Sequence, residues 1–374
     1  MIWQSSYKIV AKTVVLMYNK IMSMFSRVGD FFGLDIGTRS IRIVQLAPRD
    51  NKDGAGSFIL KNYAYLPIDP KVSADDSDLG NKKLGEAILN AIGQSSIKTK
   101  NVVLSLPSSK AFTTIIDMPD QTDVELTKTI KYQVDQYIPM AVEDAKFDWA
   151  VLGQSPRDPS KKEVILSSTS IEYSERQLEF LEDLGLNVIA MEPDQIAISR
   201  SLNMELEGAV NMIVDLGETT TELTIVYQGA PRLVRSIPIG FNTIIQSAVR
   251  GLDIKEDQAR QFILKFGLAT DKLEGKVFNA IQSVLENFTG ELNKSLKFFQ
   301  TRYPQIPVNQ IIVSGYAAMT PMMNQYIANY TNVKTVIGSP WNDVVLTPDQ
   351  QTSLMSIGAE FAVAVGLAQR GNNL

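Results

Sequence analysis

The sequence contains no cysteine and no histidine among its 374 residues. The absence of histidine excludes a Ser-His-Asp or Cys-His nucleophile system and an imidazole general base. The absence of cysteine excludes a disulfide framework, a thiolate nucleophile, an iron–sulfur cluster and a Cys/His zinc site. Any chemistry must therefore use carboxylates, hydroxyls, lysine, arginine, backbone amides or a hard cation with oxygen ligands, such as Mg²⁺.

The chain also lacks a surplus of basic residues. It has 36 basic and 41 acidic side chains, a net charge of −5, which argues against nucleic acid as a partner because nucleic-acid binders usually carry a basic surplus. The hydrophobic fraction of 44% is typical of a globular chain with a full core. At roughly 150 residues per domain, the length predicts two or three domains or one large duplicated architecture.

The first thirty residues form a basic extension. Residues 1–29 contain no acidic side chain, and their apolar residues recur every three or four positions, the pattern of an amphipathic helix with a cationic face. Lysines interrupt the apolar stretch well before the ~20 residues of a membrane span. Three interpretations stay open: a helix at an anionic lipid surface, a helix packed on the body, or a translation start placed upstream of Met22 or Met24.

Two segments of the sequence repeat each other. Asp35-Ile-Gly-x-x-Ser40-x-x-Ile43 and Asp215-Leu-Gly-x-x-Thr220-x-x-Leu223 are separated by 215 − 35 = 180 residues. Each copy is typical of a strand, a glycine turn and a returning strand, so we expect strands over 31–36, 41–46, 211–216 and 221–227. The repeat predicts two related α/β halves that face each other.

The stretch between the two copies is predicted to be a compact insert of strands and two helices. Thr122 and Glu125 form a capping-box pattern that opens a helix through about Ile138, and Ser174 is expected to cap the second helix. In the second half, the pattern predicts a core helix over 276–301 and a closing helix over 351–370. Small residues in the closing helix favour close approach to another backbone.

The predicted organisation has five parts. They are a basic amphipathic extension (1–30), the start of the first half (31–100), an inserted α/β subdomain (101–190), a connection that completes the first half (191–209) and the second half (210–370).

The glycine hairpins are the segments in which we expect chemistry. A turn of glycine and hydroxyl residues directs several backbone amides at one point, and such a nest binds phosphate oxygens. An acid just before the glycine works through a magnesium ion and its waters, which makes Asp35 and Asp215 the expected metal-associated residues. Two facing hairpins would hold a polyphosphate from both sides.

The motifs resemble those of the actin, hexokinase and heat-shock chaperone ATPase superfamily. Asp35-Ile-Gly-Thr-Arg-Ser-Ile-Arg is similar to its first phosphate motif, and Asp215-Leu-Gly-Glu-Thr-Thr-Thr is similar to its second. Ile311-Ile-Val-Ser-Gly-Tyr-Ala-Ala-Met stands where its adenosine motif belongs. The resemblance implies an actin-like fold, a duplicated ribonuclease H-like α/β ATPase fold, that binds ATP and Mg²⁺.

The resemblance also implies a set of nucleotide-binding residues. They are Asp35, Gly37, Thr38, Arg39, Ser40, Asp215, Gly217, Glu218, Thr219, Thr220, Gly315 and Tyr316. Asp215 and Glu218 are the candidates for assisting hydrolysis, with slow or negligible turnover expected. The chain departs from the adenosine motif at Tyr316, where a second glycine is usual. It also departs on the preceding helix, where Arg260 and Ile263 stand in the places of an acid and a lysine that usually contact the ribose.

Within the superfamily, the insert resembles the PilM family of type IV pilus assembly proteins, relatives of the division protein FtsA. Val103-Leu-Ser-Leu-Pro-Ser-Ser, Ile130-Lys-Tyr-Gln-Val-Asp-Gln-Tyr-Ile-Pro and Leu184-Gly-Leu-Asn-Val-Ile-Ala-Met-Glu-Pro follow the family's order. The resemblance implies a cytoplasmic scaffold at the inner face of the inner membrane. It implies binding of the N-terminal peptide of a PilN-like membrane protein and a link to the pilus motor and twitching motility.

The peptide groove implied by this resemblance has seven expected wall residues: Leu104, Leu106, Pro107, Val134, Tyr137, Ile138 and Pro139. The same residues are explained equally well as the core of the insert. Self-association and a peripheral membrane contact through residues 1–29 stay open. Two other functions also stay open, an FtsA-like division adaptor and a small-molecule kinase of the same superfamily.

Overall fold

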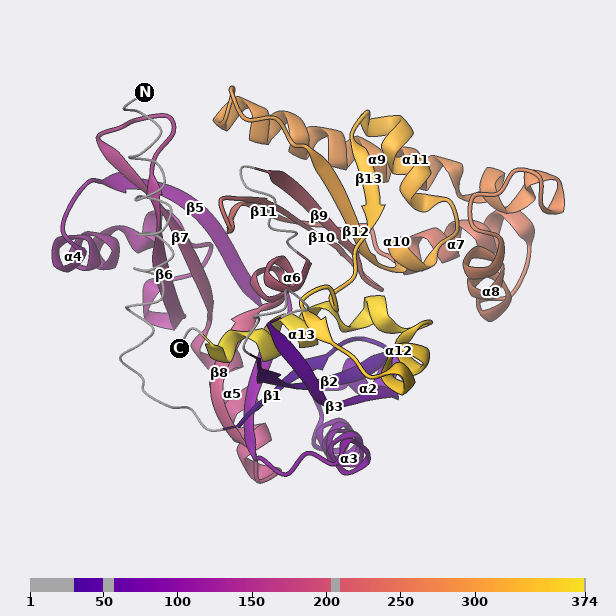
Figure 1. Cartoon of the computed structure of the whole chain (residues 1–374), viewed down its shortest axis with the longest axis horizontal. Coiled ribbons are helices and arrows are strands. Elements are labelled where there is room, and N and C mark those ends of the chain that lie inside the picture. Colours follow the sequence, from indigo (N-terminus) through magenta and orange to yellow (C-terminus); the bar gives the residue numbers. More distant parts are fainter. Residues whose placement is uncertain (1–29, 50–56, 203–208, 373–374) are drawn as a thin grey trace. The chain divides into compact units, whose positions relative to one another are not determined.

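The computed structural model describes residues 30–49, 57–202 and 209–372 (Figure 1). The predicted amphipathic extension at residues 1–29 lies outside these residues. The chain divides into two compact units. Among the described residues, the first comprises 30–49, 57–201, 343–347 and 363–372, and the second comprises 202, 209–342 and 348–362.

The first unit is built on a six-stranded sheet in the order β14-β3-β2-β1-β4-β8. The antiparallel meander consists of β1 (Phe32–Ile36), β2 (Ser40–Pro48) and β3 (Phe58–Pro67). The strands parallel to their neighbours are β4 (Asn101–Leu106), β8 (Asn187–Pro193) and the short β14 (Val344–Val345).

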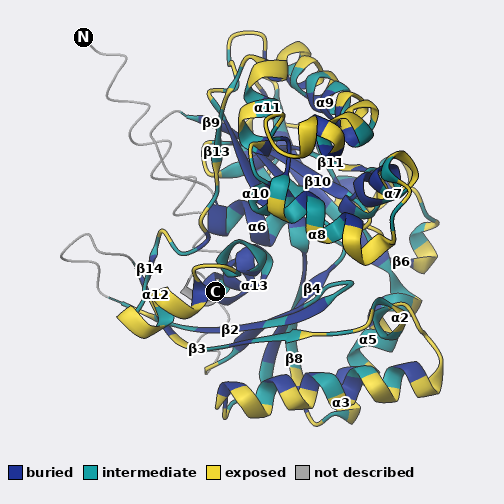
Figure 2. Ribbon diagram, turned by 90° about the vertical axis from the view of Figure 1, so that its right-hand side faces the viewer, coloured by how far each residue is buried: buried dark blue, intermediate teal, exposed yellow. Residues whose placement is uncertain are grey.

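Helices cover both faces of this sheet because successive residues of its central strands are apolar. Leu34 and Leu104 share a core with α3 (Asp78–Ser95) and α5 (Ile171–Asp183). Val103, on the opposite face, packs with α6 (Asp194–Leu202) and α13 (Ala362–Ala368). A short helix, α2 (Pro70–Ser73), precedes α3. The side of α3 away from the sheet is exposed (Figure 2).

The second unit repeats this arrangement in a five-stranded sheet, in the order β11-β10-β9-β12-β13. The meander consists of β9 (Val210–Leu216), β10 (Thr221–Tyr227) and β11 (Ala230–Ile237), and the parallel strands are β12 (Gln310–Gly315) and β13 (Lys334–Ile337). The two sheets share the order of a meander followed by two crossover strands. The predicted duplication of an α/β half is therefore present in the structure.

Five helices accompany the second sheet: α7 (Phe241–Leu252), α8 (Glu256–Phe266), α9 (Lys276–Arg302), α10 (Tyr316–Met319) and α11 (Met323–Thr331). The predicted core helix corresponds to α9, which buries Ile281, Leu285 and Phe288 along one stripe. The core of this unit joins that stripe to the apolar residues of β9, β10 and β12.

The inserted part of the first unit is a three-stranded sheet in the order β5-β7-β6. It comprises β5 (Ala111–Pro119), β6 (Ala145–Gln154) and β7 (Lys161–Ser170), with α4 (Asp123–Gln133) packed on one face (Figure 1). The sequence predicts that the insert spans residues 101–190. The structure places β4 and β8 in the six-stranded sheet because each pairs with a parallel neighbour there, so the separate sheet covers only 111–170.

The two predicted helix starts in the insert had different outcomes. The capping box of Thr122 and Glu125 is present, and α4 ends at Gln133, where a 3₁₀ turn follows. The expected cap at Ser174 was wrong, because Ser170 is the N-cap of α5. Ser174 is instead buried, and its hydroxyl donates to the carbonyl of Ile171.

The predicted closing helix over 351–370 was wrong in its continuity. The structure has α12 (Pro348–Leu354), a 3₁₀ turn (Gly358–Phe361), α13 and a further 3₁₀ turn (Gln369–Asn372). The carbonyl of Gly358 accepts a hydrogen bond of 3.2 Å from the indole of Trp341 instead of continuing α12. Among the described residues, no single helix is long and apolar enough to cross a membrane; α12 and 358–368 reach that length and composition only when counted together.

Candidate functional site

The two glycine hairpins have the same geometry. In the β1–β2 hairpin, the amide of Gly37 donates to the carbonyl of Ser40 at 3.0 Å. In the β9–β10 hairpin, the amide of Gly217 donates to the carbonyl of Thr220 at 2.9 Å. The last pairs before each turn, Ile36 with Ile41 and Leu216 with Thr221, occupy equivalent positions. The repeat in the sequence is thus a repeat of turn geometry.

A row of polar side chains crosses the sheet of the first unit beside its hairpin. Arg42 of β2 pairs with Asp35 of β1, and Ser105 of β4 pairs with Glu192 of β8. The hydroxyl of Ser105 joins the two pairs by donating to Asp35 Oδ1 at 3.2 Å. The row lies near the carboxyl ends of the parallel strands β1, β4 and β8, the edge at which α/β sheets bind their ligands.

The second unit carries a corresponding row. Ser314 of β12 pairs with Asp215 of β9, Asp215 pairs with Glu222 of β10, and Glu222 pairs with Ser236 of β11. The hydroxyl of Ser236 donates to Glu222 at 2.9 Å. Asp and Ser therefore recur at the same register, but an acid replaces the arginine, so the second row is acidic where the first holds an ion pair.

Asp35 is a buried carboxyl group in contact with a guanidinium. Arg42 forms an ion pair with it at 2.9 Å. Burial raises the pKa of Asp35 even though Arg42 and the Ser105 hydroxyl favour its ionised form. The guanidinium also lies over the turn: a Cβ on Gly37 would overlap with Arg42 Nη2. The positively charged Arg42 guanidinium therefore lies beside the turn at which a phosphate is expected to bind.

Glu192 ends the same row with a second buried carboxylate, which is not among the predicted site residues. Its oxygens bind Arg200 of α6 and, at 2.7 Å, Arg370. Burial opposes ionisation, but the two guanidinium groups together lower the pKa of Glu192 below its usual value. A glutamate at the carboxyl end of a parallel strand, followed by Pro193, was the signal that could have indicated it.

The turn of the second hairpin is joined to the N-terminus of α7. The amides of Phe241 and Asn242 each donate to a turn carbonyl, those of Gly217 and Glu218, at 2.9 Å. These bonds satisfy two of the amides that a helix leaves without intrahelical partners at its start. Gly240 precedes the helix, and a Cβ there would lie 2.5 Å from the Glu218 carbonyl oxygen.

Four side chains form a closed cluster over this turn. Arg260 of α8 binds both carboxylate oxygens of Glu218, one of them at 3.2 Å. The rings of Phe241 and Tyr316 are stacked with centroids 4.2 Å apart. The Arg260 guanidinium lies 5.3 Å from the first ring centroid and 5.6 Å from the second. Burial, followed by the nearby Glu218 charge, raises the pKa of Tyr316.

The loop between β12 and α10 brings the predicted adenosine motif against the second hairpin. Gly315 has a φ of +58°, and a Cβ on it would lie 2.7 Å from Asp215 Oδ1. Glycine adopts this backbone without steric cost and leaves the close approach open. Asp215, Gly217, Glu218, Gly315 and Tyr316 are therefore neighbours within one unit, whereas Ile263 is buried in the core.

Two other predicted turn residues, Thr38 and Arg39, form hydrogen bonds through their backbone carbonyls. The carbonyl of Thr38 accepts from the Ser73 hydroxyl at 2.7 Å, and the carbonyl of Arg39 accepts from the amide of Ile68 at 2.9 Å. Ser40 is buried, while Thr219 is exposed and Thr220 half-buried. In the described ranges, no group of three acidic residues gathers into a direct metal site.

The seven predicted groove residues divide into buried and accessible side chains. The buried ones are Leu104, Leu106, Val134 and Ile138. Three remain at the surface: Pro107 and Tyr137, which are half-buried, and Pro139, which is exposed. Only these three side chains can contribute directly to a groove in this conformation.

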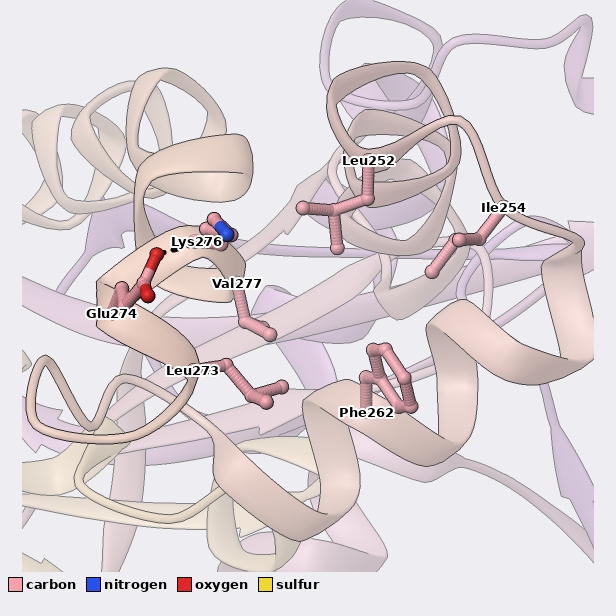
Figure 3. Close-up of a pocket in the computed structure, with 7 residues that line it drawn as sticks. All are labelled: Leu252, Ile254, Phe262, Leu273, Glu274, Lys276 and Val277. Carbon is pink, nitrogen blue, oxygen red and sulfur yellow. Dashed lines mark ion pairs between the residues drawn. The ribbon is translucent and has the colours of Figure 1, made fainter.

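A separate apolar pocket of about 290 Å³ lies between α7, α8 and the start of α9 (Figure 3). Leu252, Phe262 and Val277 are among its walls, and Glu274 pairs with Lys276 at 2.9 Å beside them. Phe262 is two residues from Arg260, so the two side chains point about 200° apart around α8. The pocket therefore lies on another side of α8 from the cluster.

Comparison with known proteins identifies relatives over most of the chain. The family model of the type IV pilus assembly protein PilM matches residues 33–372. A solved structure of a PilM–PilN type IV pilus biogenesis complex matches with a TM-score of 0.77 and 22% identity, over 92% of this chain and 99% of that chain.

More distant structures share the fold. MreB5 of Spiroplasma citri bound to ADP matches with a TM-score of 0.53 and 13% identity, over 92% of this chain and 97% of that one. The ethanolamine utilization protein EutJ from Carboxydothermus hydrogenoformans matches with a TM-score of 0.52 and 11% identity, over 96% and 99% of the two chains. The predicted actin-like ATPase fold is confirmed.

Proposed function

Because the chain belongs to the family of the type IV pilus assembly protein PilM, we propose that it is a nucleotide-binding scaffold of a type IV pilus assembly platform. The observation that carries this proposal is the match over 92% of the chain to the PilM–PilN structure. The scaffold binds the N-terminal peptide of a PilN-like inner-membrane protein, links it to the pilus motor and works at the inner face of that membrane.

The surface proposed for the peptide combines an edge strand with apolar side chains. β5 is an edge strand of the three-stranded sheet among the described residues, and an extended peptide can add to such an edge through main-chain hydrogen bonds. Tyr137 packs partly on the core of the insert and is half-buried. An amphipathic ring of this kind suits an anchor for an apolar peptide.

The peptide proposal is tested by substituting Tyr137. Truncating an aromatic anchor typically costs ~2 kcal/mol or more, so Tyr137→Ala should weaken binding of a fluorescent PilN-like N-terminal peptide by about thirtyfold or more. Tyr132→Ala is the matched control, because Tyr132 lies nearby in the sequence, on α4, and is 85% exposed. Thermal unfolding would verify that both variants are folded. Equal peptide affinities for the two variants would contradict the groove.

Each hairpin, considered within its own unit, has residues that suit a phosphate ligand or its metal ion. The glycine turns, the hydroxyls of Thr219 and Thr220 and the Arg42 guanidinium supply donors, and Asp215 with Glu222 supplies negative charge for the waters of Mg²⁺. Bound ATP would supply the phosphate charge that these groups hold. The contribution of each unit is to hold its own donors or carboxylates beside a hydrogen-bonded turn.

We propose that hydrolysis is slow or absent. In the conformation described, Glu218 is paired with Arg260, so its carboxylate is not placed to accept a proton from water unless that pair opens. Calorimetric titration with ATP and Mg²⁺ should detect binding, and a phosphate-release assay should detect little turnover. A rapid ATPase rate that Asp215→Asn abolishes would contradict this assignment.

The membrane location is tested independently of nucleotide binding. In cells, the chain should sediment with membranes when the PilN-like protein is present, because the peptide provides the attachment. It should move to the cytoplasmic fraction when the N-terminal peptide of that protein is deleted. Membrane association that survives the deletion would favour an attachment of the chain's own.

A further inference from the structure

We propose that Glu218 is an intramolecular competitor for a nucleotide phosphate and that Arg260 is the residue that recognises this phosphate. The inference rests on the proposed nucleotide binding and extends it to a specific anion subsite. The recognised chemistry is a phosphoryl anion bound to a guanidinium group. Such an anion could come from a nucleotide or from inorganic pyrophosphate, and the experiment measures the binding of both.

The cluster already holds an anion. Both carboxylate oxygens of Glu218 bind the Arg260 guanidinium, and Glu218 also interacts electrostatically with Tyr316. The two-point contact is the geometry with which arginine binds carboxylates and phosphates alike. The side chains are 15% exposed for Arg260 and 8% exposed for Glu218, so the pair is shielded from screening by solvent.

Arg260 has binding capacity that Glu218 does not use. The guanidinium offers five N–H donors. Two of its nitrogens contact Glu218, and Nη1 also reaches the Tyr316 hydroxyl at 3.4 Å. The remaining nitrogen, Nε, is buried and has no hydrogen-bond partner. A terminal phosphate has more oxygens than a carboxylate, and it could therefore satisfy a donor that the present pairing leaves unsatisfied.

The guanidinium is also held in place independently of Glu218. It lies against the stacked rings of Phe241 and Tyr316, and these contacts are typical cation–π distances. The ring pair belongs to the first residues of α7 and α10. Replacing one anion by another would therefore leave the arginine positioned, so that less conformational freedom is lost on binding.

The location of the cluster favours a nucleotide as the source of the anion. Glu218 belongs to the second phosphate-motif turn, and Tyr316 belongs to the adenosine motif, whose Gly315 contacts the end of β9. Asn242 donates to the Glu218 carbonyl at 2.9 Å, so displacement of the side chain need not release the turn. A phosphate that binds between these motifs must therefore displace the Glu218 carboxylate from Arg260.

The experiment compares binding of ADP, pyrophosphate and adenosine by calorimetry at constant ionic strength. Glu218→Gln removes the competing charge but keeps the shape of the side chain. A charged hydrogen bond is worth 1.5–3 kcal/mol, so this variant should bind ADP and pyrophosphate roughly ten- to hundredfold more tightly. Adenosine affinity should not change. Glu286→Gln is the control, because it removes the same charge from an exposed position on α9.

A double variant tests the role of Arg260 without leaving a buried carboxylate alone. Glu218→Gln combined with Arg260→Ala should lose the gain in ADP affinity, while Glu218→Gln alone keeps it. A gain in ADP affinity without a gain for pyrophosphate would show that the base and not the phosphate is recognised, and this would overturn the inference. Unchanged or weaker ADP binding in Glu218→Gln would also overturn it.

Failure of this inference can be separated from failure of the scaffold proposal. If neither the unmodified chain nor Glu218→Gln binds ADP or pyrophosphate, the anion subsite is wrong. Binding of the PilN-like peptide by the same preparations would then show that the scaffold function stands. If these preparations do not bind the peptide but Glu218→Gln still shows the gain in ADP affinity, the scaffold function is contradicted and the subsite is supported.

Discussion

Asp35 and Arg42 face each other across the first hairpin and form an ion pair of 2.9 Å, whereas Asp215, in the same position of the second hairpin, faces Glu222. The duplication has thus preserved the geometry of the turn and changed the charge beside it. The first hairpin presents a guanidinium near its glycine, which suits an anion. The second presents two carboxylates, which suit a hydrated cation.

The buried Asp35 predicts an unusual pH dependence of stability. Burial raises its pKa despite Arg42, so its contribution to folding is present below the unfolded pKa of about 3.9 and is lost as the pH rises through the folded pKa. The Asp35→Asn variant cannot titrate there. Its free energy of unfolding, relative to the unmodified chain, should therefore rise between about pH 4 and neutrality, as measured by urea unfolding. A difference that is independent of pH would contradict the raised pKa.

Glu192 should show the opposite pH dependence. Burial opposes its charge, but Arg200 and Arg370 lower its pKa. Its contribution to stability is present above the unfolded pKa of about 4.3 and is lost as the pH falls through the folded value. Glu192→Gln should destabilise the chain by about 3–5 kcal/mol at neutral pH, because it leaves two guanidinium groups without a buried partner.

Urea unfolding at a series of pH values would check this prediction. The destabilisation caused by Glu192→Gln should shrink on acidification. Glu182→Gln, an exposed position on α5, is the control and should change stability little at any pH. Equal effects of the two substitutions would show that the Glu192 cluster does not stabilise the first unit.

Local patterns in the sequence predicted the local parts of the fold. The repeat around Asp35 and Asp215 was sufficient for both hairpins, because a turn and its two strands lie within a dozen residues. The Thr122–Glu125 capping box was equally local. The place of β4 and β8 in the large sheet was not predicted, since parallel pairing joins residues far apart along the chain.

Residues of the candidate site were predicted only where they belong to a sequence motif. Asp215, Glu218 and Gly315 were expected, but the partnership of Glu218 with Arg260 joins residues 42 positions apart and depends on how α8 packs. Phe241 had no signal of its own, because an aromatic residue at the start of a helix is typical of a core. Phe241 can stack on Tyr316 because β12 pairs with β9 and so places Gly315, the residue before Tyr316, beside the end of β9. This pairing joins segments far apart in the sequence.

Removing the Tyr316 ring should destabilise the second unit. Loss of a large aromatic side chain costs 3–5 kcal/mol when it is fully buried. Because Tyr316 is half-buried, we expect about 2–3 kcal/mol for Tyr316→Ala, as measured by urea unfolding. Tyr316→Phe is the matched control: it keeps the stacked ring and should cost less than about 1 kcal/mol. Similar losses for both variants would assign the stability to the hydroxyl and not to the stack.

The close approach of α13 to α6 predicts that Gly366 tolerates no side chain. A Cβ there would collide with the carbonyl oxygen of Ala197, and the Gly366 carbonyl itself accepts from Arg200. Gly366→Ala should therefore destabilise the first unit by about 1–3 kcal/mol or more, because the two backbones must separate. Gly93→Ala is the control: nothing lies within 4 Å of its Cβ in α3, so the gain in helix propensity should stabilise the unit by up to about 1 kcal/mol. Urea unfolding of both variants would measure the difference, and a Gly366→Ala chain as stable as Gly93→Ala would show that the two helices do not pack this closely.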